Sequence, residues 1–323
     1  MERVSVAPMM EITDAPFRWI ARRLSPSVRL YTEMVTTHAL DHGDADRFLA
    51  FDPSERPVAL QLGGDDPAAL ARWASRAEGL GYDEVNLNVG CPSARVASGN
   101  FGVCLMGQPE RVAAAVASMR AAVRIPVTVK HRIGFDERDR FEDMRDFVDT
   151  VAAAGCAHFV VHARKAWLKG LSPKDNRTVP PLRHEEVDRL KAERPALWVA
   201  TNGGVRDVAA IRGHLRHVDG VMVGRWFAED LAALATVERE IFGGAPSVPN
   251  RRALAEDVLV EAERAAASGG TSIAWIRHLI PLLHGVPGAR AWRRGLSEGD
   301  RGVASLRSLL ADPRLREVLD ARL

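Results

Sequence analysis

A cysteine stands in the run N-V-G-C-P at residues 88–92, a setting in which a thiol can do chemistry. Cys91 comes two residues after a short stretch, residues 84–89, that is typical of a buried strand. With an ordinary pKa of about 8.5, a thiol is mostly protonated at neutral pH, so it can act as a general acid as well as a nucleophile. Position alone leaves a packing role equally open, because cysteine is often a small buried apolar residue.

The other two cysteines, Cys104 and Cys156, stand among apolar neighbours or at the end of a predicted helix, as packing residues commonly do. Three cysteines are an odd number in a chain of 323 residues, which argues against a disulfide framework and against a cysteine-based metal site. At least one thiol is therefore free, and no metal is expected.

Glycine-rich turns follow two later strand-like stretches, N-G-G at residues 202–204 and G-R at residues 224–225. If these two loops come together, exposed backbone N–H groups and a guanidinium converge on one anion site, which suits a phosphate. Tight turns are the simpler explanation of either motif taken alone. Their joint position favours a phosphate site.

Other polar side chains stand at the ends of predicted strands and together indicate a large polar ligand. A lysine on such a rim can hold negative charge that develops on a neighbouring ring, which suits the reduced form of a flavin. Schiff-base chemistry and a structural ion pair remain open for Lys130. The polar residues at these ends are Gln61, Asn88, Lys130, Arg132, His162 and Arg164.

Residues 162–177 form a basic segment in which six histidine, lysine and arginine side chains face one acidic residue, with Trp167 among them. Such a segment on a catalytic rim suggests a polyanionic ligand, on which an aromatic ring could stack. A solvated charged loop explains the composition equally well. The run R-A-W-R-R at residues 290–294 repeats the pattern, and there a charged helix face is the usual explanation.

The elements that must position these residues alternate between strand and helix. Because each strand-like stretch is a short apolar run bounded by turn residues, we expect parallel strands that are buried on both faces. Helical patterns at residues 67–81, 109–123 and 141–154 separate some of them. The eight predicted strands are residues 4–7, 30–34, 58–62, 84–89, 127–132, 159–162, 198–201 and 220–223.

Eight such units predict a (β/α)8 TIM barrel, which takes about 250 residues and carries its site at the carboxyl ends of the strands. A doubly wound open sheet is the rival fold. It is disfavoured because no glycine-rich G-x-G-x-x-G turn follows the first predicted strand. We therefore expect a barrel domain over residues 1–243.

The segment 243–250 is rich in glycine and proline and reads as a linker, after which the pattern changes to helices without strands. Residues 251–323 hold 12 arginines against 9 acidic residues, with apolar positions spaced for a helical bundle. The sequence thus predicts a small C-terminal helical domain over residues 251–323.

Composition adds only broad limits. With 46% hydrophobic and 27% charged residues, the chain is typical of a soluble globular protein, and its net charge of +2 gives no warrant for nucleic-acid binding by itself. No stretch is apolar for the roughly 18 residues that a membrane-spanning helix needs. We expect a cytoplasmic monomer that has no membrane association and no protein partner.

With these positions in hand, the sequence resembles the tRNA-dihydrouridine synthase family, and within it the bacterial synthase A branch. The similarity runs over nearly the whole chain, and the order and spacing of its motifs make chance improbable. The motifs lie at residues 7–10, 31–37, 57–64, 86–93, 126–130, 162–167, 171–174, 202–204 and 285–294.

The resemblance implies an FMN-binding barrel followed by a helical tRNA-binding domain, and it makes Cys91 the catalytic cysteine. His131 stands where many relatives have threonine, and its effect on substrate choice stays open. The residues that it places on FMN are Pro8, Met9, Met10, Gln61, Lys130, His162, Asn202, Gly203, Gly204, Gly224 and Arg225. The expected substrate-binding residues are Asn88 for the target uridine, with Arg132, Arg164, Lys174, Arg177, Arg290 and Arg293.

By the same resemblance, the reaction reduces a D-loop uridine of tRNA, at positions 20 and 20a, to 5,6-dihydrouridine. NADPH reduces FMN, a hydride passes to C6 of the uracil, and Cys91 donates a proton at C5. Two rivals remain open. A flavin barrel acting on free pyrimidines would need no basic tail, and an RNA-binding scaffold without redox activity would be colourless.

Overall fold

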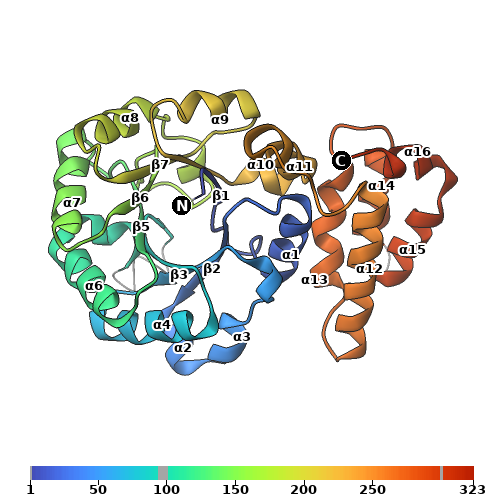
Figure 1. Ribbon diagram of the computed structural model, residues 1–323, viewed down its shortest axis with the longest axis horizontal. Coiled ribbons are helices and arrows are strands. Elements are labelled where there is room, and N and C mark those ends of the chain that lie inside the picture. The colour runs from blue at the N-terminus through green and yellow to red at the C-terminus, as the bar shows by residue number, and fades with distance from the viewer. Residues whose placement is uncertain (1, 94–100, 299–300) are drawn as a thin grey trace. The chain divides into compact units, whose positions relative to one another are not determined.

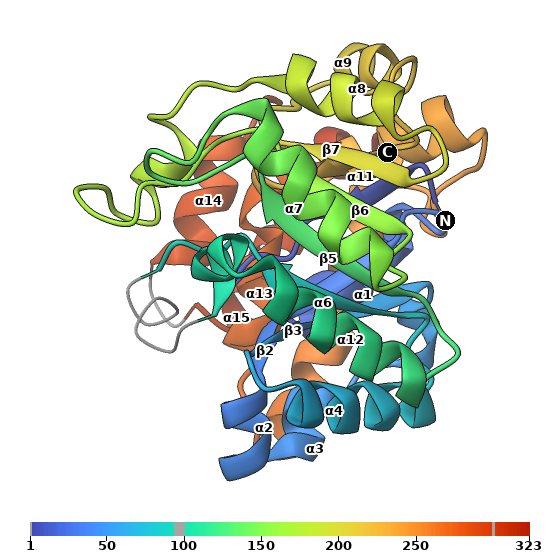
Figure 2. The ribbon, with the colours of Figure 1, turned by 90° about the vertical axis from the view of Figure 1, so that its left-hand side faces the viewer.

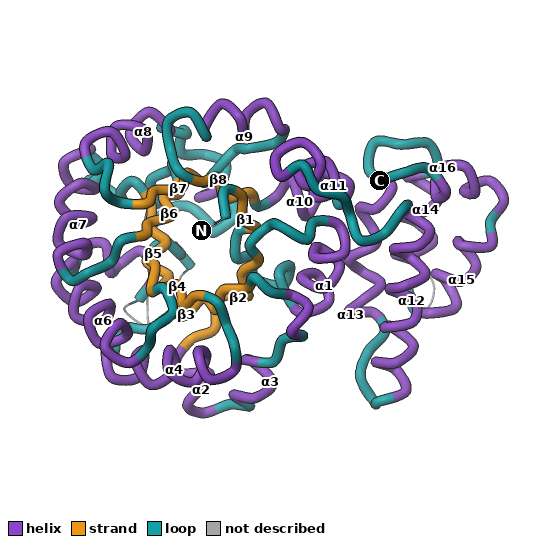
Figure 3. The backbone as a smooth tube through the Cα atoms, viewed as in Figure 1, coloured by secondary structure: helices purple, strands orange, loops and turns teal. Residues whose placement is uncertain are grey.

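Eight parallel strands form one sheet in the computed structural model, which describes residues 2–93, 101–298 and 301–323. The sheet runs in the order β1-β8-β7-β6-β5-β4-β3-β2, and a parallel bridge between Ser5 and Arg29 joins its two edges. The ring of strands is visible in Figure 3. The strands are β1 (Val4–Val6), β2 (Leu30–Thr36), β3 (Val58–Gly63), β4 (Glu84–Val89), β5 (Val127–Arg132), β6 (His158–His162), β7 (Trp198–Asn202) and β8 (Gly220–Val223).

Helices cover the outside of this ring, as Figure 1 shows. Figure 2 shows the layer from the side, where α4, α6 and α7 follow one another along the sheet. The (β/α)8 barrel predicted from the sequence is therefore confirmed, since strand and helix alternate around the ring. The helices are α2 (Thr37–His42), α3 (Ala45–Leu49), α4 (Pro67–Leu80), α6 (Pro109–Ala122), α7 (Phe141–Ala153), α8 (His184–Glu193) and α9 (Val208–His214).

The local signals that end these elements are visible in α4. Asp66 accepts a hydrogen bond from the Ala68 N–H at the start of the helix, and Pro67 occupies its first turn. Gly81 ends it in the left-handed region at φ 97°, where glycine is favoured. The predicted strands match closely: β4, β5 and β8 have the predicted bounds, and the others differ by one or two residues at an end.

Apolar side chains fill part of the barrel interior, while the strands also carry polar residues inward. A buried cluster of Ala7, Tyr31, Ala59, Val160, Ala200 and Met222 packs there, with Met9 and Trp198 against it. In β5 the alternation of a strand sends Thr128, Lys130 and Arg132 to one face and His131 to the other. The inward residues of β5 make the contacts described below.

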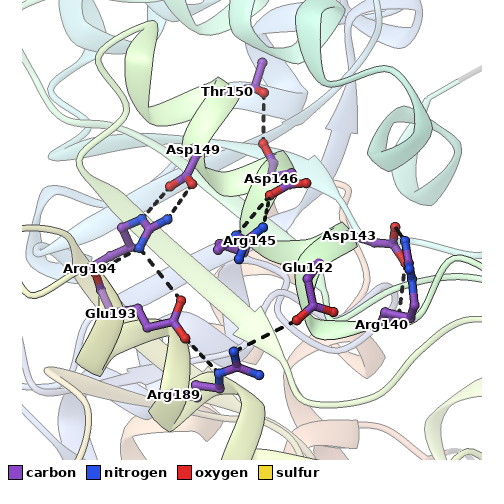
Figure 4. Close-up of polar contacts among 10 residues, drawn as sticks. All are labelled: Arg140, Glu142, Asp143, Arg145, Asp146, Asp149, Thr150, Arg189, Glu193 and Arg194. Carbon is purple, nitrogen blue, oxygen red and sulfur yellow. Dashed lines mark hydrogen bonds and ion pairs between the residues drawn. The ribbon is translucent and has the colours of Figure 1, made fainter.

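The helix layer carries a surface ion-pair network between α7 and α8 (Figure 4). The guanidinium of Arg194 makes two 2.6 Å hydrogen bonds to the carboxylate of Asp149, and Arg189 bonds Glu193 at 2.8 Å. Arg189 also lies 3.9 Å from Glu142. Exposed pairs of this kind typically contribute less than about 1 kcal/mol each, so the network supports the layer without deciding the fold.

The chain divides into two compact units, one of Met1–Glu11 with Arg29–Gly224 and one of Ile12–Val28 with Arg225–Leu323. The first unit is the barrel. The second is helical. Its helices are α1 (Ala15–Leu24), α10 (Arg225–Glu229), α11 (Ala232–Val237), α12 (Arg251–Ala267), α13 (Ile273–Ile276), α14 (Ala289–Ser297), α15 (Val303–Ala311) and α16 (Arg316–Asp320).

Buried polar contacts explain why Ile12–Val28 packs with the C-terminal helices. Asp14 caps α1 and also accepts hydrogen bonds from Arg277 at 2.5 Å and His278 at 2.7 Å. Glu238 accepts a 2.6 Å hydrogen bond from the Ser25 hydroxyl. A division into functional domains at residues 243–250 was drawn from composition and stays a prediction.

In the described ranges, no helix has both the length and the apolar character to cross a bilayer.

His131 belongs to the layer between strands and helices. Its ring packs 5.1 Å from Phe147 of α7 and 5.9 Å from Phe159, and Nδ1 lies 2.7 Å from the carbonyl oxygen of Arg132. Burial lowers the pKa of His131 to about 4. Because the side chain faces away from the barrel interior, its contacts are those of a packing residue.

We predict that His131→Asn makes folding less sensitive to acid. The folded state holds His131 neutral, so its stabilising effect is complete above about pH 6.5 and is lost as the pH falls toward about 4, by up to about 3 kcal/mol. Asparagine keeps a donor for the Arg132 carbonyl but does not titrate. Urea unfolding between pH 7 and pH 4 measures the difference.

His42→Asn, at an exposed histidine, is the control and should follow the unchanged protein. If the free energy of unfolding fell equally between pH 7 and pH 4 in His131→Asn and in the unchanged protein, the His131 ring would not be held neutral by burial.

Candidate active site at the carboxyl end of the barrel

Four polar side chains from four strands are linked in two pairs near the carboxyl ends of the strands. The Asn88 side-chain amide donates to Gln61 Oε1 at 2.8 Å, and Lys130 Nζ donates to Asn202 Oδ1 at 3.1 Å. Strand register brings the pairs together, because Asn88 is aligned with Lys130 in adjacent strands. His162 is aligned with Asn202 in the same way. The structure thus gathers these predicted site residues on one rim.

Both backbone groups of Cys91, its N–H and its carbonyl oxygen, are hydrogen-bonded at this rim. Asn88 Oδ1 accepts hydrogen bonds from the N–H groups of Gly90 at 3.1 Å and Cys91 at 3.0 Å. The Cys91 carbonyl oxygen accepts from the Val103 N–H at 3.1 Å. The thiol is half-buried and lies 3.6 Å from the Ser93 hydroxyl. A short loop with a fixed backbone therefore presents the thiol.

The other two cysteines have different surroundings. Cys156 is buried, and desolvation raises the pKa of its thiol to about 12. Burial also raises the pKa of Cys104, which lies in the 3-10 helix η2 (Gly102–Gly107). Both thiols therefore stay protonated at neutral pH, which agrees with the packing role predicted for them.

Lys130 is a half-buried cation inside the barrel. Its ammonium donates to Asn202, and no carboxylate of the described residues lies within ion-pair distance of it. Desolvation, followed by the charge of Arg132, lowers the pKa of Lys130 to about 7. A charge held away from water without a partner is costly, so an anionic ligand beside it would be stabilised.

Arg132 is almost fully buried and donates to three backbone carbonyls. The acceptors are Gly90 at 2.9 Å, Lys165 at 3.0 Å and Asn176 at 3.0 Å. The first belongs to residues 90–93, the Cys91 loop, and the other two belong to the basic segment, residues 162–177. Arg132 was predicted to bind substrate. In the structure its Nε and Nη1 atoms hold two loops of the rim together.

Arg164 shows a similar arrangement. It is buried, and its Nη1 atom donates to the carbonyl oxygen of Thr178 at 3.4 Å and to that of Pro180. The described contacts of this second predicted substrate residue therefore fold the basic segment back on itself. Sequence reasoning missed this role, because an arginine at a strand end looks the same whether it faces a ligand or a loop.

Asn176 was also missed from the sequence, although it organises the basic segment. It is fully buried, its Oδ1 accepts from the Trp167 N–H at 2.7 Å, and its Nδ2 donates to the Trp167 carbonyl at 2.9 Å. The Lys165 ammonium pairs with the Asp139 carboxylate at 3.0 Å and lies 4.0 Å from the centre of the Trp167 ring. Lys174 and Arg177, in contrast, are exposed.

The glycines after β7 have the backbone that their sequence predicts. Gly203 lies at φ 120° and Gly204 at φ 70°, where other residues are strained. A Cβ atom on Gly203 would lie 2.8 Å from Leu182 and 3.0 Å from the His162 ring. Only glycine therefore fits at this position, against the side chains of Leu182 and His162.

The ends of β1 and β8 lie close to each other. A Cβ atom on Gly224 would meet the Met9 sulfur at 3.3 Å, and the Ala7 N–H donates to the Val223 carbonyl at 2.7 Å. Pro8 and Met9 are half-buried. Met10 is 57% exposed, a high value for a large apolar side chain. Arg225 follows Gly224 in the chain and opens α10 of the second unit.

In the second unit, α14 turns Arg290 and Arg293 to the solvent. Trp292 between them is fully buried, and its indole N–H donates to the Leu279 carbonyl at 2.7 Å. The aromatic ring of this basic run therefore anchors the helix, while its arginines are displayed. Within the described ranges, no group of three or more histidine, cysteine, aspartate or glutamate side chains is arranged to hold a metal ion.

Comparison with known proteins gives one consistent result. A family model described as dihydrouridine synthase (Dus) matches residues 5–314. A protein of Synechocystis sp. named tRNA-dihydrouridine(20/20a) synthase is 54% identical over 295 residues, which cover 91% of this chain and 88% of that protein. Proteins of the same name from Shewanella oneidensis and Escherichia coli are 51% and 52% identical, cover 91% and 92% of this chain, and are themselves covered to 88% and 86%.

We predict that Lys130→Met stabilises the ligand-free protein at neutral pH by roughly 3 to 5 kcal/mol. The pKa of Lys130 is lowered on folding, so its contribution to stability is complete only above about pH 10.5 and is lost as the pH falls to about 7. Urea unfolding at pH 7 and pH 10 measures the change.

The gain from Lys130→Met should therefore shrink at pH 10. Lys169→Met, at an exposed lysine, should leave stability nearly unchanged at both pH values. A Lys130→Met variant that is less stable at pH 7 than the unchanged protein would show that other groups already compensate the charge of Lys130.

Proposed function

Because the chain belongs to the dihydrouridine synthase family, we propose that it reduces a uridine of tRNA to 5,6-dihydrouridine, in the D-loop at positions 20 and 20a. The observation that carries this proposal is the placement of Cys91 on the same rim as Lys130. The Cys91 N–H donates to Asn88 Oδ1 at 3.0 Å, and Asn88 is aligned with Lys130 in the neighbouring strand. The names of the relatives support the substrate, since proteins 51% to 54% identical over most of the chain carry it in their names.

We propose FMN as the resident cofactor. The residues of the rim fit its chemistry, because Lys130 is a half-buried cation with no carboxylate partner in the described ranges and the glycines of the turn after β7 have no side chains of their own. When bound, FMN supplies the hydride for C6 of the uracil, with NADPH as the source of electrons. The barrel residues proposed to hold it are Pro8, Met9, Met10, Gln61, Lys130, His162, Asn202, Gly203, Gly204 and Gly224. Arg225 stays a sequence-based prediction.

Cys91 is proposed as the proton donor to C5 of the uracil. Its Sγ–H bond breaks as the C5–H bond forms, and the sulfur is left as a thiolate that recovers its proton from solvent. Desolvation lowers the pKa of Lys130 and that of Arg132, and the charge interaction of each group with Cys91 opposes this lowering. The same attraction stabilises the thiolate when it forms.

A uridine stacked within folded tRNA cannot reach this thiol, so it must leave its stack at a cost of a few kcal/mol. Contacts with the phosphate backbone elsewhere can offset that cost. In the first unit, the exposed Lys174 and Arg177 are proposed for this role. In the second, the exposed Arg290 and Arg293 of α14 are proposed.

We expect Cys91→Ala to keep bound flavin and NADPH oxidation but to lower the rate of tRNA reduction by about 100-fold or more, because a general acid typically contributes about 10²- to 10⁴-fold. Cys104→Ala is the matched control, since its thiol lies in η2 and is assigned to packing. Dihydrouridine is counted by mass spectrometry of the digested tRNA. Full activity of Cys91→Ala would remove the assignment of the acid.

Replacing Arg290 and Arg293 together by glutamine should weaken tRNA binding and reduce its dependence on salt. Each lost phosphate contact lowers the slope of log affinity against log salt by roughly 0.7 to 0.9. Filter binding over a salt series measures this slope. Arg316→Gln, at another exposed arginine of the second unit, should change neither quantity, and NADPH oxidation should be unaffected in all variants. An unchanged slope in the double variant would exclude α14 as a tRNA contact.

A further inference from the structure

A continuous line of hydrogen-bonded side chains runs inside the barrel from the start of β4 to its end. The Thr128 hydroxyl donates to Glu84 Oε1 at 2.5 Å, and Asn86 Nδ2 donates to Thr128 Oγ1 at 2.7 Å. Gln61 Nε2 donates to Asn86 Oδ1 at 2.7 Å, and Asn88 Nδ2 donates to Gln61 Oε1 at 2.8 Å. The line ends on the Cys91 loop, so it connects a carboxylate below the site with the backbone of the thiol.

The line can run in only one direction. Glu84 Oε1 accepts from both Thr128 and Tyr31, the latter at 2.7 Å. A hydroxyl has a single proton, so Thr128, having given its proton to Glu84, can only accept from Asn86. The amide nitrogen of Asn86 must therefore face Thr128, and its oxygen must face the next residue.

The same rule fixes the two remaining amides. Asn86 presents an oxygen, so Gln61 must turn its nitrogen toward it and its own oxygen toward Asn88. Asn88 then presents its nitrogen to Gln61 and its oxygen to the N–H groups of Gly90 and Cys91. The two ends of the line require the same orientation independently, because a carboxylate accepts at one end and two backbone groups donate at the other.

The carboxylate that sets this direction is itself held in place. Glu84 and Asn86 are fully buried, and Arg29 Nη1 lies 3.4 Å from the second oxygen of Glu84. Arg29 is in turn paired with Glu2 at 2.5 Å. Burial raises the pKa of Tyr31 well above its ordinary value, so the Tyr31 hydroxyl keeps its proton and remains a donor. Burial raises the pKa of Glu84 too, but Arg29 and the hydroxyl donors Thr128 and Tyr31 oppose this by favouring the carboxylate, and in that charged form Oε1 is an acceptor only.

We propose that Glu84, Thr128 and Asn86 are positioning residues of the reaction, because their hydrogen-bond line sets the orientation of the Gln61 and Asn88 amides and so holds the Cys91 loop. This inference rests on the proposed function for its meaning in catalysis. The orientation of Asn88 also bears on which base the site accepts. Asn88 uses one proton of its amide nitrogen for Gln61, so the second proton is available to a ligand. The rim then offers a donor, which recognises ring carbonyl oxygens, and uracil has two of these where cytosine has one.

Thr128→Val in the FMN-loaded, full-length protein tests the proposal. Valine has nearly the shape of threonine but cannot accept from Asn86, so the line loses one of the two ends that fix it and the buried Asn86 amide is left with an unpaired donor. We expect the Cys91 loop to loosen, alkylation of Cys91 by iodoacetamide to become at least about threefold faster, and kcat for tRNA reduction to fall about tenfold or more. Because the exposed basic residues are untouched, KM for tRNA should stay within about twofold. Thr128→Ser restores the hydroxyl and should restore both readouts.

Tyr31→Phe is the matched control. It removes the other hydroxyl that donates to Glu84, at the same burial, but leaves the line to Asn88 complete. If Thr128 served only the stability of the barrel, Tyr31→Phe and Thr128→Val would change the Cys91 alkylation rate and kcat equally. The proposal predicts that only Thr128→Val changes Cys91 alkylation. If Thr128→Val does not fold, Thr128→Ala provides the same measurement in a smaller side chain.

The alkylation rate is followed by peptide mass spectrometry and does not depend on any reaction with tRNA. If the unchanged protein reduces no tRNA, the proposed function fails while the alkylation comparison still decides the positioning role. The positioning role is overturned if Cys91 in Thr128→Val is alkylated at the unchanged rate, or if Thr128→Ser is as impaired as Thr128→Val.

Discussion

The placement of the half-buried Lys130 ammonium inside the barrel is the constraint on which the rest of the site depends. A positive charge inside a barrel is costly without a negative partner, and the described residues provide only the Asn202 amide oxygen, at 3.1 Å. Its pKa, lowered to about 7, expresses that cost. The fold therefore holds a charge ready for a ligand that is negative or becomes negative during the reaction, and a reduced flavin has this property.

The loops around that charge are held by residues whose chemistry would equally suit a ligand. Arg132 donates to carbonyls of the Cys91 loop and of the basic segment, and Asn176 holds the basic segment through the backbone of Trp167. Each of these groups satisfies buried backbone that would otherwise be unpaired. Catalytic and binding residues can then sit on loops without losing a defined position, because the buried arginine and amides fix the backbone beneath them.

Much of the fold could be predicted from the sequence, because parallel strands buried on both faces leave apolar runs that turn residues interrupt. The bounds of β4, β5 and β8 agree with that reading. The internal partners of the polar residues could not be predicted. Lys165 counts as a basic residue in the sequence, yet Asp139, far from it in the chain, neutralises it. The packing of α1 with C-terminal helices depends in the same way on distant partners, Asp14 with His278 and Ser25 with Glu238.

Reduction of a tRNA uridine to 5,6-dihydrouridine is tested most directly by mass spectrometry of tRNA from cells that lack this gene. In such cells the D-loop fragment should lose the two-hydrogen increment at a uridine of positions 20 and 20a, and the intact gene should restore it. If the D-loop kept its dihydrouridine, or if only the reduction of free pyrimidines were lost, the proposed substrate would be contradicted.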